Sequence, residues 1–262
     1  MLVDIHVHTS RHSDCGRSDP DSMVEAAIAR GLDAIVLTEH NYMWTQEELA
    51  PLQRRHPEIK LFGGIEVSVK MDGGQHMVIL GVPDPDLFYP TMPPAELIAA
   101  VRRHGGAAIL AHPYRWTPEV HEDILRAGFD AIEICSNSIR NYMQQPICEL
   151  QRQTKVPLVV SSDGHHVTEL GLYALDLPTM PVDDKELAAM IRHGEFSLWC
   201  NHQRIDAMNA EIRKRRQQIP RLLEQGLEHK SALHKVGLSK NLAYALEKNL
   251  DIYYPKECKH DY

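Results

Sequence analysis

The sequence predicts an α/β protein whose strands form a barrel, followed by a helical C-terminal extension. Short apolar runs alternate with helical patterns over about seven units, and nearly every apolar run ends in polar side chains. In (β/α) barrels, active sites are built from several strands at their C-terminal ends. A doubly wound sheet would also fit the alternation, and the polar residues favour the barrel. The pattern changes after residue 201, so we predict a barrel over 1–201 and a helical extension over 202–262.

The predicted elements follow one another in a regular order. A capping box from Thr45 to Glu48 begins the second helix, and Gly31 ends the first. Two strands flank a turn at 72–74. Because the strand runs are apolar, we expect a parallel sheet covered on both faces. In chain order the elements are LVDIHVH, PDSMVEAAIARG, DAIVLTEH, TQEELAPLQRR, KLFGGIEVSV, HMVILGV, PPAELIAAVRRHGG, AAILAHP, TPEVHEDILRAG, AIEICSN, a helix through 140–153, PLVVSSDGH, DDKELAAMIRHG and EFSLWCN.

Charge and cysteine content exclude several classes of protein. The 262 residues carry a net charge of −8, which argues against nucleic-acid binding by the chain as a whole. Residues 202–262 are basic by +4, so the preceding residues carry −12. The five cysteines form no CxxC pair, which argues against a disulfide framework or a zinc-finger cage and predicts reduced thiols in a cytoplasmic protein. No signal peptide or membrane span is expected.

Histidines and carboxylates gather at the predicted strand ends. His6 and His8 point to the same side of the first strand, because side chains alternate along a strand. An HxH pair alone is a weak signal, but similar residues recur at later strand ends, while no cysteine takes part. Imidazole and carboxylate ligands suit Zn²⁺, Mn²⁺ or Fe²⁺. We therefore predict a multinuclear metal site, with further candidates at His40, Glu66, His76, His112, Asp163 and His165.

These segments resemble the PHP (polymerase and histidinol phosphatase) family. The resemblance covers roughly residues 1–200, and it rests on the motifs DIHVHTSRHSDCG, GLDAIVLTEHN, GGIEVSV, HMVILG, AILAHPYR, FDAIEICSN and VVSSDGHH. It implies a metal-dependent phosphoesterase with a distorted (β/α)7 TIM-like barrel and three divalent metal ions, here Zn, Mn or Fe. A hydroxide activated by these ions would attack phosphorus, so no Ser or Cys nucleophile is needed.

The resemblance also implies a ligand for each metal position. One ion would be held by His6, His8, Glu66 and Asp163. Glu66 would bridge to a second ion that His76 and His112 also hold. Asp14, His40 and His165 would hold the third.

Two stretches of the sequence leave alternatives open. His12 is the more obvious ligand by residue type, but the family's third-metal ligand lies six residues beyond the second histidine of HxH, which favours Asp14. Cys15 stands where relatives usually have glycine. Arg115 and Arg140 are candidate phosphate contacts, and each could equally be a surface arginine.

Four further polar residues receive weaker assignments. Asp4 is expected to accept a hydrogen bond from a ligating imidazole. Arg17 is a weaker candidate for phosphate contact. Glu39 and His166 have no predicted role and are expected to be exposed.

The extension has two features of its own. Apolar residues at helical spacing between Ile205 and Leu227, and again from Leu238 to Leu250, predict packing against the barrel or a second subunit. The basic run 213–218 is typical of a solvated helix face, and nucleic-acid binding is the alternative.

The expected substrate is a small phosphate monoester or a nucleotide. One alternative is a 5'–3' exonuclease or oligonucleotide phosphodiesterase. In that case the basic extension would guide the nucleic-acid strand. Another is a non-catalytic metal-binding structural module. A histidinol-phosphate phosphatase is disfavoured, because no arginine follows the DxH pair at 163–165.

Overall fold

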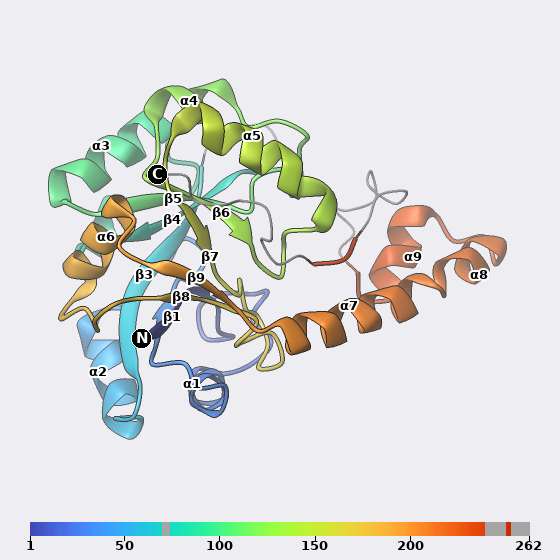
Figure 1. Cartoon of the computed structure of the whole chain (residues 1–262), viewed down its shortest axis with the longest axis horizontal. Coiled ribbons are helices and arrows are strands. Elements are labelled where there is room, and N and C mark those ends of the chain that lie inside the picture. Colours follow the sequence, from blue (N-terminus) through green and yellow to red (C-terminus); the bar gives the residue numbers. More distant parts are fainter. Residues whose placement is uncertain (70–73, 239–249, 253–262) are drawn as a thin grey trace.

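The computed structural model describes residues 1–69, 74–238 and 250–252. Its strands form one nine-stranded sheet that rolls into a nearly closed barrel, with helices packed around the outside (Figure 1). This confirms the predicted TIM-like α/β barrel. Most of the predicted turn at 72–74, and Leu242 and Leu246 of the apolar stripe, lie outside the described residues.

The sheet has the strand order β7-β6-β5-β4-β3-β2-β1-β8-β9. Backbone hydrogen bonds join β1 to the segment after β7 and so bring the two ends of the barrel together. The His8 N–H donates to the Gly164 carbonyl at 2.8 Å, and the Gly164 N–H donates to the His6 carbonyl at 3.3 Å. The strands are β1 Leu2–Val7, β2 Ala34–Leu37, β3 Lys60–Ser68, β4 His76–Leu80, β5 Ala107–Ala111, β6 Ala131–Cys135, β7 Leu158–Val160, β8 Tyr173–Asp176 and β9 Ser197–Cys200.

Two strands, β4 and β8, depart from the predicted parallel arrangement. β4 runs antiparallel to both β3 and β5, and β8 runs antiparallel to both β1 and β9. Too few residues separate β3 from β4 for the crossover that a parallel pair requires. The expectation of a wholly parallel sheet is therefore wrong at these strands, and β8 was not predicted as a strand.

The helices of the barrel lie close to their predicted positions. Thr45 and Glu48 form the expected reciprocal capping box at the start of α2. One helix is shorter than predicted, because α4 begins only where the His121 side chain caps it. The barrel helices are α1 Pro20–Ala29, α2 Gln46–Arg55, α3 Pro94–His104, α4 Glu122–Ala127, α5 Gln144–Thr154 and α6 Asp184–His193, with short 3-10 helices η1 Pro85–Leu87 and η2 Asn141–Met143.

The chain after the barrel forms α7 His202–Arg216, α8 Ile219–Glu224 and α9 His229–Lys235. In Figure 1, α7 leads away from the sheet, and α8 and α9 lie at its far end. The predicted apolar stripe packs as expected, because Ile205, Ile212 and Ile219 are buried in the same hydrophobic core as the barrel strands. The division of the chain at residue 201 remains a prediction.

Two further expectations concern the whole chain. Within the described ranges, no helix has both the length and the apolar character needed to cross a membrane. Cys15, Cys135 and Cys200 are free thiols, whereas Cys148 is disulfide-bonded, so the expectation of reduced thiols does not hold at Cys148.

Candidate metal centre

The predicted ligands lie at one rim of the barrel. His6 is in β1 and His8 follows that strand directly, while His112 follows β5 and Asp163 lies three residues beyond β7. His76 is the first residue of β4, yet it reaches the same rim because β4 runs antiparallel to its neighbours. The reversed strand thus brings its N-terminal residue to the rim where neighbouring parallel strands end.

Glu66, in β3, lies at the centre of the cluster and is fully buried. Its two carboxylate oxygens face different sets of histidines. Oε1 lies 2.7 Å from His76 Nδ1 and 2.8 Å from His112 Nε2. Oε2 lies 2.8 Å from His40 Nδ1, 3.2 Å from His8 Nε2 and 3.5 Å from His6 Nε2. This is the arrangement expected of a carboxylate between two cations.

Asp163 forms the second carboxylate of the cluster. Its Oδ1 lies 3.4 Å from Nε2 of both His6 and His8, and 3.6 Å from His165 Nδ1. On the other side, Arg115 Nη1 lies 3.6 Å from Oδ2. Asp163 therefore lies between the histidines and one of the two arginines predicted to contact phosphate.

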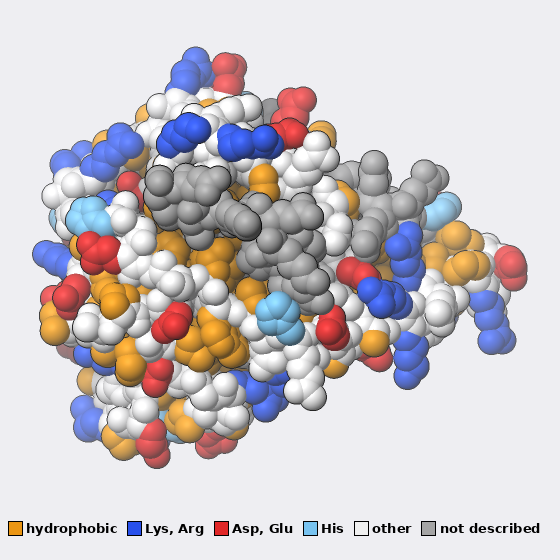
Figure 2. All heavy atoms as spheres, viewed as in Figure 1, with side chains coloured by type: hydrophobic (Ala, Val, Ile, Leu, Met, Phe, Trp, Pro, Cys, Tyr) orange, Lys and Arg blue, Asp and Glu red, His pale blue; other side chains and the backbone are white. Residues whose placement is uncertain are grey.

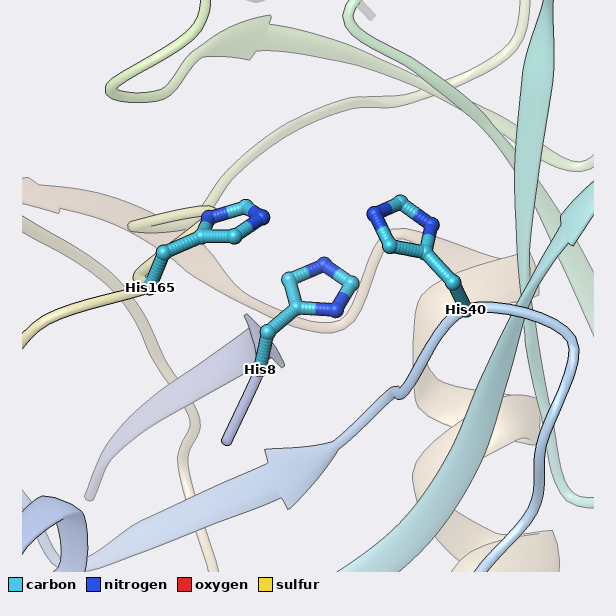
Figure 3. A group of neighbouring side chains, drawn as sticks. All are labelled: His8, His40 and His165. Atoms are coloured by element: carbon cyan, nitrogen blue, oxygen red, sulfur yellow. The ribbon is translucent and has the colours of Figure 1, made fainter. Parts of the chain in front are cut away.

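Eight of the nine predicted metal ligands form four overlapping groups whose ligand atoms lie within 4.8 Å of one another. Three histidines from separate parts of the chain, His8, His40 and His165, make up one group and turn their rings toward a common space (Figure 3). The other groups are His6, His8 and Asp163; His6, Glu66 and His112; and His40, Glu66 and His76.

Asp14, the ninth predicted ligand, is exposed and belongs to none of the groups found among the described residues. The neighbouring Cys15 thiol instead lies near His165 and His40. Partial burial raises the Cys15 pKa, but these two histidines outweigh it and lower the pKa to about 6. His12 lies apart, stacked on Tyr42 at 3.8 Å between ring centroids. The structure thus places neither Asp14 nor His12 against His40 and His165.

Charge coupling dominates the electrostatics of the cluster. Burial alone lowers the pKa of His6, but Asp163 and Glu66 raise it well above its usual value. Burial raises the pKa of Glu66, yet His76, His40 and His6 hold it well below its usual value. In the absence of metal, protons on His6 and His40 therefore help to balance the buried carboxylates.

Several buried ligand atoms have no hydrogen-bond partner among the described residues: Glu66 Oε2, both carboxylate oxygens of Asp163, and His112 Nδ1. Unsatisfied buried polar atoms are costly, and a bound divalent cation would supply the carboxylate oxygens with a partner. The donor set contains only imidazole and carboxylate groups, which suit Zn²⁺, Mn²⁺ and Fe²⁺. The residues therefore fit metal ions.

The backbone is strained at two of the clustered residues. His112 has φ of 27° and Asp163 has φ of 47°, both in the left-handed region that non-glycine residues rarely adopt. Each such residue costs about 1–3 kcal/mol and persists only where the surrounding structure holds it. At each position this backbone conformation accompanies a side chain that lies in the cluster.

Glu133, in β6, is an important residue that the sequence did not single out. Its Oε1 lies 3.1 Å from His6 Nδ1 and accepts a hydrogen bond from the Ser161 hydroxyl, while Oε2 accepts the His112 N–H at 2.8 Å. A carboxylate behind a ligating imidazole fixes its tautomer and orientation. The signal in the sequence was a single carboxylate within the apolar strand AIEIC.

Two other acidic residues differ from their predicted roles. Asp4 was expected to orient an imidazole, but its side chain accepts the Ser162 N–H at 2.9 Å and so supports the loop before Asp163. Glu39 was expected to be exposed, yet it is fully buried and accepts hydrogen bonds from Thr9 and from Trp44 Nε1. Glu39 therefore fixes the loop that follows the HxH pair.

A pocket of about 470 Å³ opens beside the cluster. Arg115 and Arg140 both line it, next to His165 and Cys15. The far wall comes from the extension, through His234, Gly237 and Leu238. Both arginines predicted to bind phosphate thus line a cavity that the barrel and the extension form together.

The barrel and its histidine- and carboxylate-lined rim define an α/β barrel protein with a candidate metal centre. The model of the PHP domain family matches residues 4–156, more than half of the chain, so the chain belongs to the PHP domain family. This confirms the resemblance that the motifs indicated.

Individual relatives are distant. The uncharacterized protein MJ1587 of Methanocaldococcus jannaschii is 25% identical over 128 residues, which cover 44% of this chain and 68% of that protein. A putative metal-dependent phosphoesterase from Bifidobacterium adolescentis superposes with a TM-score of 0.54 at 16% identity, covering 72% of this chain and 96% of that one. The lesion-specific endonuclease PfuEndoQ from Pyrococcus furiosus gives a TM-score of 0.55 at 14% identity, over 75% of this chain and 57% of that one. These similarities in structure concern the fold.

Proposed function

We propose that the protein is a metal-dependent phosphoesterase that hydrolyses a small phosphate monoester or a nucleotide at a centre of three divalent cations. The observation that carries the proposal is the gathering of six histidines around the carboxylates of Glu66 and Asp163, beside a pocket lined by arginines. Family membership supports the same chemistry.

The two oxygens of Glu66 support a bridging role. The first cation is assigned to His6, His8, Glu66 and Asp163, and the second to Glu66, His76 and His112. His76 and His112 approach one carboxylate oxygen, whereas His6 and His8 approach the other. The third cation is assigned to His40, His165 and Asp14, the last of which must move inward to bind.

Bound cations would polarise phosphate oxygens and acidify a water molecule at neutral pH. The chain itself orients the reacting groups. Arg115, close to Asp163, is placed to bind a phosphate oxygen at the edge of the centre. Glu133 holds the His6 ring in the orientation in which Nε2 faces the cluster.

The decisive experiment is a phosphate-release screen over a panel of metabolites with Mn²⁺, Zn²⁺ and Fe²⁺. We expect at least one ester to be hydrolysed, and Glu66→Gln to abolish both turnover and metal binding. Glu58→Gln, an exposed position away from the centre, is the matched control. If no ester in the panel releases phosphate from the metal-loaded protein, the proposal fails.

Cleavage of oligonucleotides is a second candidate. Lys and Arg side chains are distributed over the projecting α7–α9 part of the surface (Figure 2), and the fold is shared with an endonuclease. However, Arg213 pairs with Asp251 and Arg215 pairs with Glu211, which neutralises part of this charge. Activity on oligonucleotides that falls steeply with salt would favour this function over the small ester.

A structural module without catalysis is the remaining alternative. It requires that the clustered residues bind no metal or bind it without turnover. Metal analysis of the purified protein separates these cases, because an empty centre under all growth conditions would support the structural role.

A further inference from the structure

The pocket beside the metal centre contains a buried cation whose charge the described residues do not balance. Arg140 follows β6, in the loop before η2, and it is 8% exposed. Its Nη1 donates to the Asn137 carbonyl at 2.5 Å, while Nε is buried without a hydrogen-bond partner among the described residues. No carboxylate of the described ranges lies within ion-pair distance of it.

The other arginines of the pocket are placed differently. Arg17 is paired with Glu169, and Arg115 lies 3.6 Å from Asp163 Oδ2. The second oxygen of Glu169 accepts the His165 N–H at 2.8 Å, so this carboxylate is already occupied. The acidic residue on the pocket wall is therefore engaged elsewhere.

Burying an uncompensated guanidinium is unfavourable. Burial, together with the nearby positive charge of Arg115, lowers the pKa of Arg140 to about 10. A buried charge persists in a folded protein when a partner of opposite charge offsets the desolvation. Because Arg140 lines an open pocket, a ligand can supply that partner.

The loop that carries Arg140 is fixed at both ends. The Asn137 N–H donates to the Ser162 carbonyl at 2.9 Å, next to Asp163, and the Asn141 N–H donates to the Asp251 carbonyl at 2.7 Å. Arg140 is thus held at a constant separation from the metal centre, as a preorganised binding site requires.

The pocket is large enough to hold two anionic groups of one ligand. At about 470 Å³ it has room for considerably more than one phosphate group, and it extends from His165, in the metal cluster, to His234 and Leu238 of the extension. Arg115 stands at the end next to Asp163. The Arg140 side chain donates to its own loop, and among the described residues no hydrogen bond or ion pair joins it to a predicted metal ligand.

We propose that Arg140 binds a second anionic group of the substrate, distinct from the phosphate at the metal centre, so that the natural substrate is a phosphate ester bearing a further phosphate or carboxylate. This inference rests on the proposed phosphoesterase function and assigns separate roles to the two arginines. Arg115 contacts the reacting phosphate, and Arg140 selects substrates by their remote anion.

The hydrolytic test compares a short alkanediol bisphosphate with the corresponding monophosphate on the metal-loaded, full-length protein. We expect kcat/KM to be about ten- to hundredfold higher for the bisphosphate, the range that one charge-assisted hydrogen bond contributes. Arg140→Gln should remove most of this preference, mainly through KM. Arg140→Lys should retain part of it, and the exposed Arg126→Gln should retain all of it.

A binding test separates this inference from the proposed function. Calorimetry with an alkane bisphosphonate and a monophosphonate, neither of which is hydrolysed, measures the second anion site directly. If no ester is hydrolysed but the bisphosphonate binds more tightly and Arg140→Gln abolishes the difference, the subsite stands and the phosphoesterase proposal fails.

Two outcomes would overturn the inference. In one, wild-type protein shows no preference for the second anion in either binding or hydrolysis. In the other, Arg140→Gln weakens the monoanionic and dianionic ligands by the same factor while remaining folded, which would place Arg140 at the reacting phosphate.

Discussion

At the scale of single residues, histidines of the metal-free cluster carry protons that metal ions must displace. Burial lowers the pKa of His40, but Glu66 raises it, to about 10. His40 therefore carries a proton at neutral pH in the metal-free protein, whereas a ligating imidazole must be neutral. We expect the apparent metal affinity to rise about tenfold per pH unit for each displaced proton between pH 6 and 9.

Proton release can be measured by calorimetric metal titrations in two buffers of different ionisation enthalpy. An affinity that does not change with pH, or a titration that releases no proton, would contradict this account of the cluster. The exposed His193→Gln serves as the control and should leave the pH dependence unaltered.

The third cation offers a sharp comparison between three neighbouring residues. Asp14→Ala should reduce the bound metal from three ions to two, because Asp14 is assigned to this ion together with His40 and His165. His12→Ala should leave the metal content unchanged, since His12 is held by Tyr42 and Glu48.

Cys15→Ser provides the third arm of this comparison, because the Cys15 thiol lies near both histidines. We expect its metal content to match that of the wild type. If Cys15→Ser loses the third ion while Asp14→Ala keeps it, the thiol and not the carboxylate is the ligand.

Glu133 allows a test of how the imidazoles are oriented. Glu133→Gln keeps the shape of the side chain but weakens its hold on His6 and on the His112 N–H. Loss of such a supporting carboxylate typically lowers metal affinity or activity about 10- to 100-fold. Metal titration should show this loss, and the exposed Glu149→Gln should not.

The sequence singled out clustered residues where the signal was local. The HxH pair and the residues at the strand ends are visible as letters next to apolar runs, and eight of them meet in space. Glu39 and Glu133 were missed because their partners, such as Trp44 for one and His112 for the other, come from other segments. Burial of a carboxylate depends on donors that the local sequence does not show.

At the scale of elements, strand direction was the main error. Apolar runs indicate burial on both faces but carry no information about direction, so the reversal of β4 was not recognised, and β8 was not predicted as a strand. His76 lies in the cluster although its strand was taken to run the other way. The reversal explains why this residue begins its strand while the others lie at or beyond the ends of theirs.

Gly64 of β3 packs closely against β4, and this close contact can be tested by its effect on stability. A Cβ atom on Gly64 would lie 2.9 Å from a Leu80 methyl carbon and 3.0 Å from the Ile79 carbonyl oxygen. Such overpacking typically costs about 1–3 kcal/mol. Gly64→Ala should therefore lower the midpoint of thermal unfolding markedly.

The adjacent Gly63→Ala is the matched control for this test, because its Cβ would meet the flexible Leu49 side chain at 3.3 Å. It should shift the midpoint less. Equal shifts for the two variants would show that strand flexibility, and not the close approach to β4, accounts for the change.

At the scale of the whole molecule, the extension is part of the same core and also forms a wall of the pocket. Composition alone predicted a separate helical segment, because the charge changes sign and strands cease after residue 201. Composition could not show that the extension contributes residues to the pocket, since that depends on the length and direction of α7. Removing residues 202–262 would therefore expose core residues and alter the pocket together.

A point variant tests the coupling between extension and pocket more cleanly. Asn209, buried in α7, donates through Nδ2 to the Ile252 carbonyl at 2.9 Å and accepts the Ile252 N–H at 2.7 Å. The next residue back, Asp251, accepts the N–H of Asn141, which follows Arg140. Asn209→Ala leaves buried backbone groups unpaired, which should cost about 1–3 kcal/mol.

If this attachment holds the Arg140 loop in place, Asn209→Ala should speed hydrogen exchange at the Asn141 amide and reduce the preference for dianionic substrates. The exposed Gln203→Ala, on the same helix, should change neither. Loss of stability without faster exchange at Asn141 would show that the extension stabilises the barrel but does not position the pocket. Faster exchange with an unchanged substrate preference would show that the fixed separation between Arg140 and the metal centre does not depend on the extension.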